Sequence, residues 1–366
     1  MAGINPLDTL KIKKLIGFKQ ITPGVITGDL ITALKQCGIN SVTGYMQYNS
    51  EFSIGQMSVL GNTFYGLKSV TQKTKTSGFI DFNILNKASA LKEHPVQVGF
   101  RLTQSAVSQN KTNTTILSFL NAYSIDITPK VTANTEDSSV YYEIVFGVQP
   151  DSNKIDRIII QVYVNKQQVS SGNITAYEYA PVIMRAGNSL SPDTDAGFSY
   201  MVGDIYVAEL DYNSDGTVTP QLLGNLTLEP FTVASYAGDK HTNTKNQDIV
   251  TALNTLDPNN DMGALSIKPV EQPASVTFNA PDIAGKSIYG ASLNIIYKDS
   301  LAPNNRLNYQ ITEGTTQLPA ETIMARNADI TGYTLFSKIL TVPEGGGEWD
   351  ADNLKFKLDI VNKGAE

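Results

Sequence analysis

Cysteine is almost absent from this sequence: Cys37 is the only one among 366 residues. A single thiol excludes an internal disulfide, so the fold must depend on its hydrophobic core. Charged residues are also few, at 17 %. No run approaches the roughly 18 apolar residues that a membrane-spanning helix needs, so we expect no membrane span. The first residues lack the apolar stretch and cleavage site of a signal peptide.

Positive charge and catalytic motifs are scarce as well. The formal net charge of −7 gives the chain no general attraction for nucleic acid. The only histidines are His94 and His241, and neither accompanies a nucleophile motif. The sequence holds no C-x-x-C, H-E-x-x-H or phosphate-binding glycine loop, so we expect no cofactor. Glycoside hydrolysis needs only two carboxylates and leaves no motif, but nothing here favours it, and we predict a protein that is not an enzyme.

Alternating apolar and polar residues dominate the chain from about residue 60. In HPVQVGFRLTQS (94–105), Val96, Val98, Phe100 and Leu102 share one face, and Gln97, Gly99 and Arg101 the other. The segments 138–150 and 154–169 are rich in β-branched and aromatic residues, and the run 158–160 predicts a central strand covered on both faces. Short strands separated by Gly, Pro, Asn and Asp indicate an antiparallel sandwich.

The predicted fold class is all-β: an antiparallel jelly-roll β-sandwich followed by a smaller β-sandwich. We divide the chain into an irregular N-terminal attachment or assembly segment (1–60), a jelly roll (61–230), a linker with a short helix (231–273) and the small sandwich (274–366). Apolar residues at helical spacing predict one short helix at 28–38 and another at 246–258. The first of these helices needs a surface to dock on.

The stretch 211–216 has the D-x-N-x-D-G spacing that begins a calcium loop, with Asp211, Asn213 and Asp215 as ligands. A complete loop also needs a carboxylate at its twelfth position, which is Leu222 here, and a helix on each side. The flanking sequences are strands, and Asp-Gly between strands is a hairpin signal. The sequence therefore favours a plain turn, with calcium binding as the alternative.

Exposed aromatic side chains are the other candidate binding feature. Tyr177 and Tyr179, in AYEYAP, are candidate glycan contacts, because an aromatic ring can cover the face of a sugar. The competing interpretation is that most of the 17 tyrosines line sheet faces and interfaces.

The order of segments resembles a known family. SGFIDFNIL, YYEIVFGV, DRIIIQVYVN and FSYMVGDIYVAELD are similar to the strands of concanavalin-like (LamG-like) jelly rolls. With the later SIYGASLNIIYKD and GGGEWDADNLKFKLDI, residues 60–366 resemble virion structural proteins of tailed bacteriophages. The resemblance implies a structural role in the particle, often as an oligomer and sometimes with glycan contact, and it carries no catalytic residues.

Two functions follow as expectations. The first is a structural component of a tailed-phage particle (tail, collar or capsid decoration), located in the virion and assembling with other virion proteins and with copies of itself. The alternative is a carbohydrate-binding module that recognises a host surface glycan.

Overall fold

The computed structural model describes most of the chain. The described residues are 10–26, 34, 42–45, 51–70, 79–83, 88–106, 115–120, 126–132, 135–149, 157–175, 183–187, 199–239, 241–243, 247–256, 265–269, 272–297, 305–324, 334–343, 346–351 and 354–365.

The chain forms two compact units. Unit 1 comprises residues 1–18, 23–31 and 39–228, and unit 2 comprises residues 19–22, 32–38 and 229–366. Every pairing between the named strands is antiparallel, and the prediction of an all-β antiparallel fold is confirmed.

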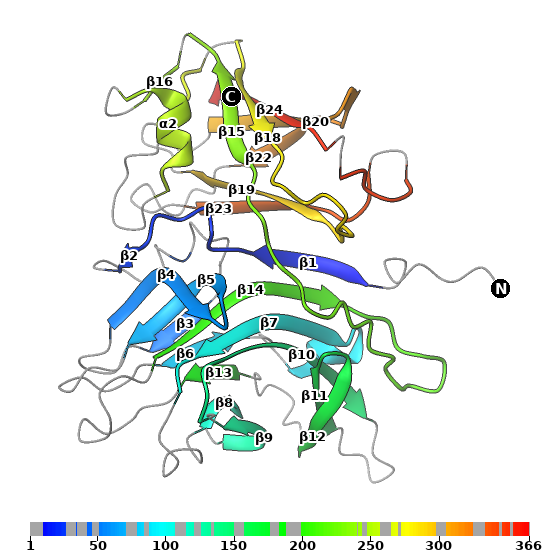
Figure 1. Cartoon of the computed structure of the whole chain (residues 1–366). Coiled ribbons are helices and arrows are strands. Elements are labelled where there is room, and N and C mark those ends of the chain that lie inside the picture. Colours follow the sequence, from blue (N-terminus) through cyan, green and yellow to red (C-terminus); the bar gives the residue numbers. More distant parts are fainter. Residues whose placement is uncertain are drawn as a thin grey trace. The chain divides into compact units, whose positions relative to one another are not determined.

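Unit 1 contains a nine-stranded sheet (Figure 1). Eight strands follow in the order β12 (Gln167–Thr175), β11 (Arg157–Val164), β10 (Ser138–Gln149), β7 (Val96–Gln104), β14 (Ser199–Glu209), β5 (Asn62–Val70), β4 (Glu51–Val59) and β2 (Gly24–Val25), and β1 (Lys11–Ile16) pairs with β14. The short 3-10 helix η2 (Ala88–Lys92) precedes β7.

The second layer of unit 1 is a five-stranded sheet. Its order is β3 (Val42–Tyr45), β6 (Phe79–Asn83), β13 (Ile183–Gly187), β8 (Thr115–Leu120) and β9 (Asp126–Thr132). The apolar faces of the two sheets meet in the core, where the ring of Phe119 in β8 lies 5.7 Å from that of Phe146 in β10. Because strand side chains alternate, the residues between these apolar positions point to the opposite face of the nine-stranded sheet, which we call the outer face.

The apolar run 158–160 is one place where the structure differs from the sequence prediction. Ile158 and Ile160 are fully buried, but Ile159 is only half-buried on the outer face. The strand β11 is next to the edge of its sheet rather than central. One face of β11 is therefore covered by the second sheet, and the other is only partly covered.

Unit 2 contains a six-stranded sheet, two shorter sheets and one helix. The larger sheet runs β15 (Thr232–Ala237), β18 (Ala274–Asn279), β24 (Phe356–Ala365), β20 (Asn305–Glu313) and β21 (Thr316–Gln317), with β22 (Glu321–Met324) also paired to β20. The shorter sheets pair β16 (Thr242–Asn243) with β17 (Leu265–Ser266) and β19 (Ala291–Tyr297) with β23 (Thr334–Leu340). Its core gathers Tyr309, Ile311, Leu318, Ile323, Leu358 and Ile360.

The predicted second helix is present as α2 (Ile249–Asn254). Asp248 caps it, because its side chain accepts a hydrogen bond from the Thr251 N–H. Of the first predicted helix, 28–38, only Leu34 lies within the described residues, and it is helical and buried.

The four-part functional division stays a prediction. In the structure, β1, β2 and β4 from residues 1–60 pair in the same sheet as later strands. The segment expected as a linker, 231–273, supplies β15, β16, α2 and β17 to unit 2.

Candidate functional site

Polar side chains line the outer face of unit 1 where β7, β10 and β14 lie side by side. Gln97, Arg101, Thr103 and Glu143 are all buried there. Gln97 and Arg101 occupy the face opposite the apolar residues of β7, as the alternation predicted. Burying a polar group costs folding free energy unless the group is hydrogen-bonded. The hydrogen-bond partners of these side chains therefore show which segment this face binds.

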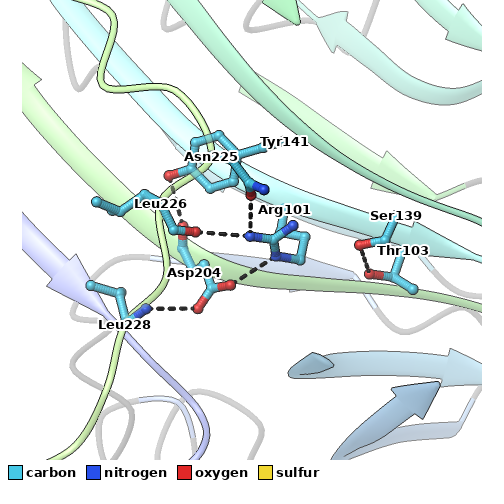
Figure 2. A network of polar contacts seen from close by, with 8 residues as sticks. All are labelled: Arg101, Thr103, Ser139, Tyr141, Asp204, Asn225, Leu226 and Leu228. Atoms are coloured by element: carbon cyan, nitrogen blue, oxygen red, sulfur yellow. Dashed lines mark hydrogen bonds and ion pairs between the residues drawn. The ribbon is translucent and has the colours of Figure 1, made fainter. Parts of the chain in front are cut away.

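Arg101 is the centre of one network (Figure 2). Its Nε donates to Asp204 Oδ2 at 2.9 Å, and one terminal nitrogen donates to Asn225 Oδ1 at 2.6 Å and to the Leu226 carbonyl at 2.9 Å. The guanidinium carbon also lies 4.7 Å from the centre of the Phe64 ring. The charge is thus paired, hydrogen-bonded and stacked, as a buried arginine requires.

Asp204 owes its position to a β-bulge. The register of β14 against β7 shifts between Gly203 and Tyr206, and Asp204 has a φ of 47°. Left-handed backbone is unusual outside glycine, although aspartate tolerates it better than most residues. The bulge turns Asp204 toward Arg101, and its other oxygen accepts from the Leu228 N–H at 3.1 Å. Its carbonyl accepts from the Tyr141 hydroxyl, also at 3.1 Å.

Glu143 is the centre of a second network on the same face. Its Oε1 accepts from the Tyr206 hydroxyl at 2.6 Å and from the Leu223 N–H at 2.7 Å, and its Oε2 accepts from the Gly224 N–H at 3.0 Å. Burial raises the pKa of the Glu143 carboxyl, and these hydrogen bonds oppose that rise. Burial also holds the pKa of Tyr206 well above its ordinary value, so this tyrosine stays a donor.

Both networks hold the same segment, residues 219–228, which we call the strap. Gln97 pairs with the backbone of Gln221, donating to its carbonyl at 2.9 Å and accepting from its N–H at 3.1 Å. Glu143, Arg101 and Asp204 then bind the backbone at Leu223, Gly224, Leu226 and Leu228. Side chains of the sheet thereby supply the backbone hydrogen bonds that a neighbouring strand would otherwise make with the strap.

Beside the strap, the outer face is exposed at β12 and partly buried at β11. We call this surface the shelf and define it by Ile159, Gln161, Tyr163, Gln168, Ser171 and Asn173. Gln168, Ser171 and Asn173 are exposed and Gln161 is half-buried, while Tyr163 is 8 % exposed. The pairing of the strands sets Asn173 opposite Ile159, Ser171 opposite Gln161 and Gln168 opposite Tyr163.

The strap and the preceding turn form the wall of the shelf. A Cβ atom on Gly147 would lie 3.0 Å from Val218, and Gly147 is opposite Ile159. A Cβ on Gly224 would lie 3.0 Å from Cε of Lys166, at the turn between β11 and β12. The shelf therefore offers amide and hydroxyl groups along a raised border, which is chemistry suited to a polyhydroxylated ligand.

The predicted calcium ligands lie in a turn closed by its own hydrogen bonds. Asp211 pairs with Lys11 at 2.9 Å, which lowers the pKa of its carboxyl, while Asp215 accepts from the Thr217 N–H and hydroxyl. Asn213 donates to Thr217 and Thr219. Tyr212 and Val218 form an antiparallel bridge across the turn. Within the described residues, no three carboxylate, imidazole or thiol side chains gather as metal ligands would.

The other singled-out residues do not join this site. Tyr177 and Tyr179 lie outside the described residues, as does Cys37. His241 is buried, and its two ring nitrogens lie 3.0 Å from the Gln272 carbonyl and 3.2 Å from the Lys268 N–H. His94 lies 3.4 Å from Asp211. No helix in the described part of the chain is long and apolar enough to cross a membrane.

Sequence reasoning missed the two networks. Its available signal was the presence of polar residues at some outward positions of otherwise apolar strands: Gln97 and Arg101 in β7, and Glu143 in β10. That alternation marks the face but does not reveal the strap, because the partners lie far along the chain.

No family model matches the chain, and no curated protein sequence matches it. Solved structures do match. An alginate lyase, Aly36B, in complex with alginate trisaccharide has 9 % identity and a TM-score of 0.37, covering 55 % of this chain and 98 % of its own.

Two further matches have similar extent. The CBM22-1 xylan-binding domain of Xyn10C from Paenibacillus barcinonensis has 10 % identity and a TM-score of 0.24, over 56 % of this chain and 98 % of that one. The carbohydrate esterase vb_24B_21 of the Shiga toxin-encoding bacteriophage phi24B has 9 % identity and a TM-score of 0.26, over 54 % of this chain and 100 % of that one.

The matched structures thus include an alginate lyase, a xylan-binding domain and a carbohydrate esterase, and they correct one prediction. We expected a protein that is not an enzyme because the sequence has no catalytic motif. A lyase and an esterase occur among the matched structures, so the lack of a sequence motif does not exclude catalysis. At these identities and TM-scores the matches assign neither an activity nor a substrate to this chain.

Proposed function

We propose that unit 1 is a carbohydrate-binding β-sandwich and that the glycan contacts the shelf. The observation that carries this proposal is the row of amide and hydroxyl side chains on β11 and β12. Gln161, Gln168, Ser171 and Asn173 offer donors and acceptors in rows along the strands, and amides can serve as both. The strap borders this row, so a chain of sugar residues would lie along the strands against a wall.

A glycan array followed by calorimetric titration of the best ligand tests this proposal. The variant Gln161→Ala/Asn173→Ala should lower the affinity for that ligand at least tenfold, because it removes two amides from the shelf. The matched control is Gln317→Ala, which removes an exposed amide from β21 in unit 2 and should leave the affinity unchanged. An array without a ligand, or equal affinities for the two variants, would refute the proposal.

A structural role in a tailed-phage particle is the second candidate. The observation that favours it is the long uncharged edge strand β12, because assembly proteins need surfaces that pair with further subunits. On this proposal the protein is located in the virion and contacts other virion proteins. Mass spectrometry of purified particles should then detect the chain in a fixed ratio to the major capsid protein. Its absence from intact particles would refute the virion role without affecting the glycan proposal.

A further inference from the structure

The strand β12 ends the nine-stranded sheet, and no described strand pairs with its outer edge, although β9, at the edge of the second sheet, packs against β12 (Figure 1). A free edge presents unpaired N–H and C=O groups, which can pair with another chain. Proteins usually protect such an edge with charge, proline, a very short strand or a covering element.

Several other edge strands carry such protection, whereas β19, which forms a two-stranded sheet with β23, has neither charge nor proline. Three lysines lie in β1, and β9 contains Pro129 and Lys130. The strands β2 and β21 have only two residues each, and β3 and β22 have only four each. The edge strand β15 is covered by α2, whose Asn254 side chain accepts from the Val233 N–H at 2.8 Å and donates to the Val233 carbonyl at 2.9 Å.

In contrast, β12 has nine residues, QQVSSGNIT, with no charge and no proline. It is the longest of these edge strands. A register shift against β11 leaves Val169 as an extra residue at one end. Its side chain is 56 % exposed, and few large apolar side chains in the described part of the chain are so exposed. The stretch from Ser170 to Thr175 then continues in regular pairing with β11.

We propose that β12 pairs with β12 of a second copy of this chain, joining the two nine-stranded sheets across a two-fold axis. A second copy is the partner that the charges favour. The chain carries a net charge of −7, so copies repel one another through most surfaces, but the β12 edge carries no charge to oppose self-pairing. Two-fold dimers are also the commonest closed assemblies, and one shared strand meets their requirement for a self-complementary surface.

The geometry of this pairing is specific. Full-length antiparallel pairing of two identical strands that run from 167 to 175 sets Ser171 opposite its own copy on the axis. Val169 then lies opposite Asn173 of the second copy and loses its exposure to water. The two shelves become neighbours on one continuous outer face.

Sedimentation equilibrium of the full chain tests the pairing. The unmodified protein should be a dimer, and Val169→Lys should raise the dimer dissociation constant at least tenfold, because it places a charge in the new ladder. The matched control is Thr316→Lys, which adds the same charge to an exposed position in β21 and should leave the dimer intact. A wild-type chain that remains monomeric, or a dimer that Val169→Lys leaves unchanged, would overturn the proposal.

Cross-linking keeps the proposal testable if Val169→Lys does not fold. In a Cys37→Ser background, Ser171→Cys should form a disulfide-linked dimer on mild oxidation, since directly opposed residues have Cβ atoms close enough for a disulfide. Asn173→Cys in the same background should remain monomeric, because its partner across the axis is Val169. Equal cross-linking of the two variants would rule out this register.

Discussion

At the scale of the residue, Asp204 combines an unusual backbone with a buried charge. Its carboxylate neutralises Arg101, which is 3 % exposed, from a position with a φ of 47°. We expect Asp204→Ala to destabilise unit 1 by about 3–5 kcal/mol, because a buried guanidinium loses its counter-charge. Asp204→Asn keeps the shape and tolerates the backbone, so it should cost less. Urea denaturation checks both, and an Asn variant as stable as the wild type would contradict the role of the charge, because asparagine keeps the shape and removes only the charge.

The Glu143 carboxyl gives unit 1 a specific pH dependence. A pKa raised on folding from its ordinary 4.5 means that the folded state holds this proton more tightly than the unfolded state. The contribution of Glu143 to stability is therefore greatest at low pH and falls as the pH rises from about 4.5 through the raised pKa.

The variant Glu143→Gln has no such titration, although its amide nitrogen cannot accept from the Gly224 N–H. We expect the free energy of unfolding of the variant, relative to the wild type, to increase as the pH rises through that range. Denaturation curves at matched pH values measure this difference. A difference that is constant with pH, or that decreases, would contradict the raised pKa.

These two residues also mark how far the sequence could predict the site. The face that carries Gln97 and Arg101 followed from alternation, because one residue in two points outward along a strand. The turn of Asp204 toward Arg101 did not follow, since it depends on a bulge between β14 and β7, which are far apart in the sequence. Gly203 faces the Tyr65 carbonyl so closely that a Cβ there would lie 2.1 Å away.

At the scale of the element, the turn of the β4–β5 hairpin places a leucine in strained, left-handed backbone. Its two-residue turn is Leu60–Gly61, with φ values of 50° and 79°. Leucine has no favourable local contact to offset left-handed backbone, and its side chain is 88 % exposed. We expect Leu60→Asn to stabilise unit 1 by about 1 kcal/mol, because asparagine suits this position before glycine. Leu60→Ala, measured by the same thermal denaturation, is the control and should give a smaller gain.

Elements with regular alternation were predictable, and irregular ones were not. The strand containing GDIYVAEL and the helix that follows Asp248 were both found from sequence. The strap was not found, because the hydrogen bonds of its backbone go to side chains of β7, β10 and β14. Such bonding requires no periodic pattern in the sequence of the strap. The partly covered face of Ile159 was missed for a related reason: an apolar run does not tell a central strand from one beside an edge.

At the scale of the whole molecule, unit 2 includes two short segments from the start of the chain. Ile21 is 3 % exposed and forms a parallel bridge with Leu256, and the Thr22 N–H donates to the Leu256 carbonyl at 2.7 Å. We therefore expect a fragment 229–366 to be less stable than unit 2 in the full chain. Near-ultraviolet circular dichroism and denaturation of the fragment measure this loss.

A point variant separates this effect from truncation itself. Ile21→Ala in the full chain should lower the stability of unit 2 by about 2–5 kcal/mol, the usual cost of truncating a buried isoleucine. Lys13→Ala is the control, because its exposed pair with Glu209 contributes little. A fragment as stable as unit 2 in the full protein would mean that residues 19–22 add nothing to its core.

The dependence of unit 2 on residues 19–22 also sets an order of events during synthesis. The N-terminal residues leave the ribosome first, but Ile21 cannot form its bridge with Leu256 until Leu256 has been translated, much later. Closing that long loop is slow compared with forming hairpins such as β4–β5. Unit 2 is therefore completed only after most of the polypeptide has left the ribosome, and its N-terminal segments stay exposed to chaperones and proteases until then.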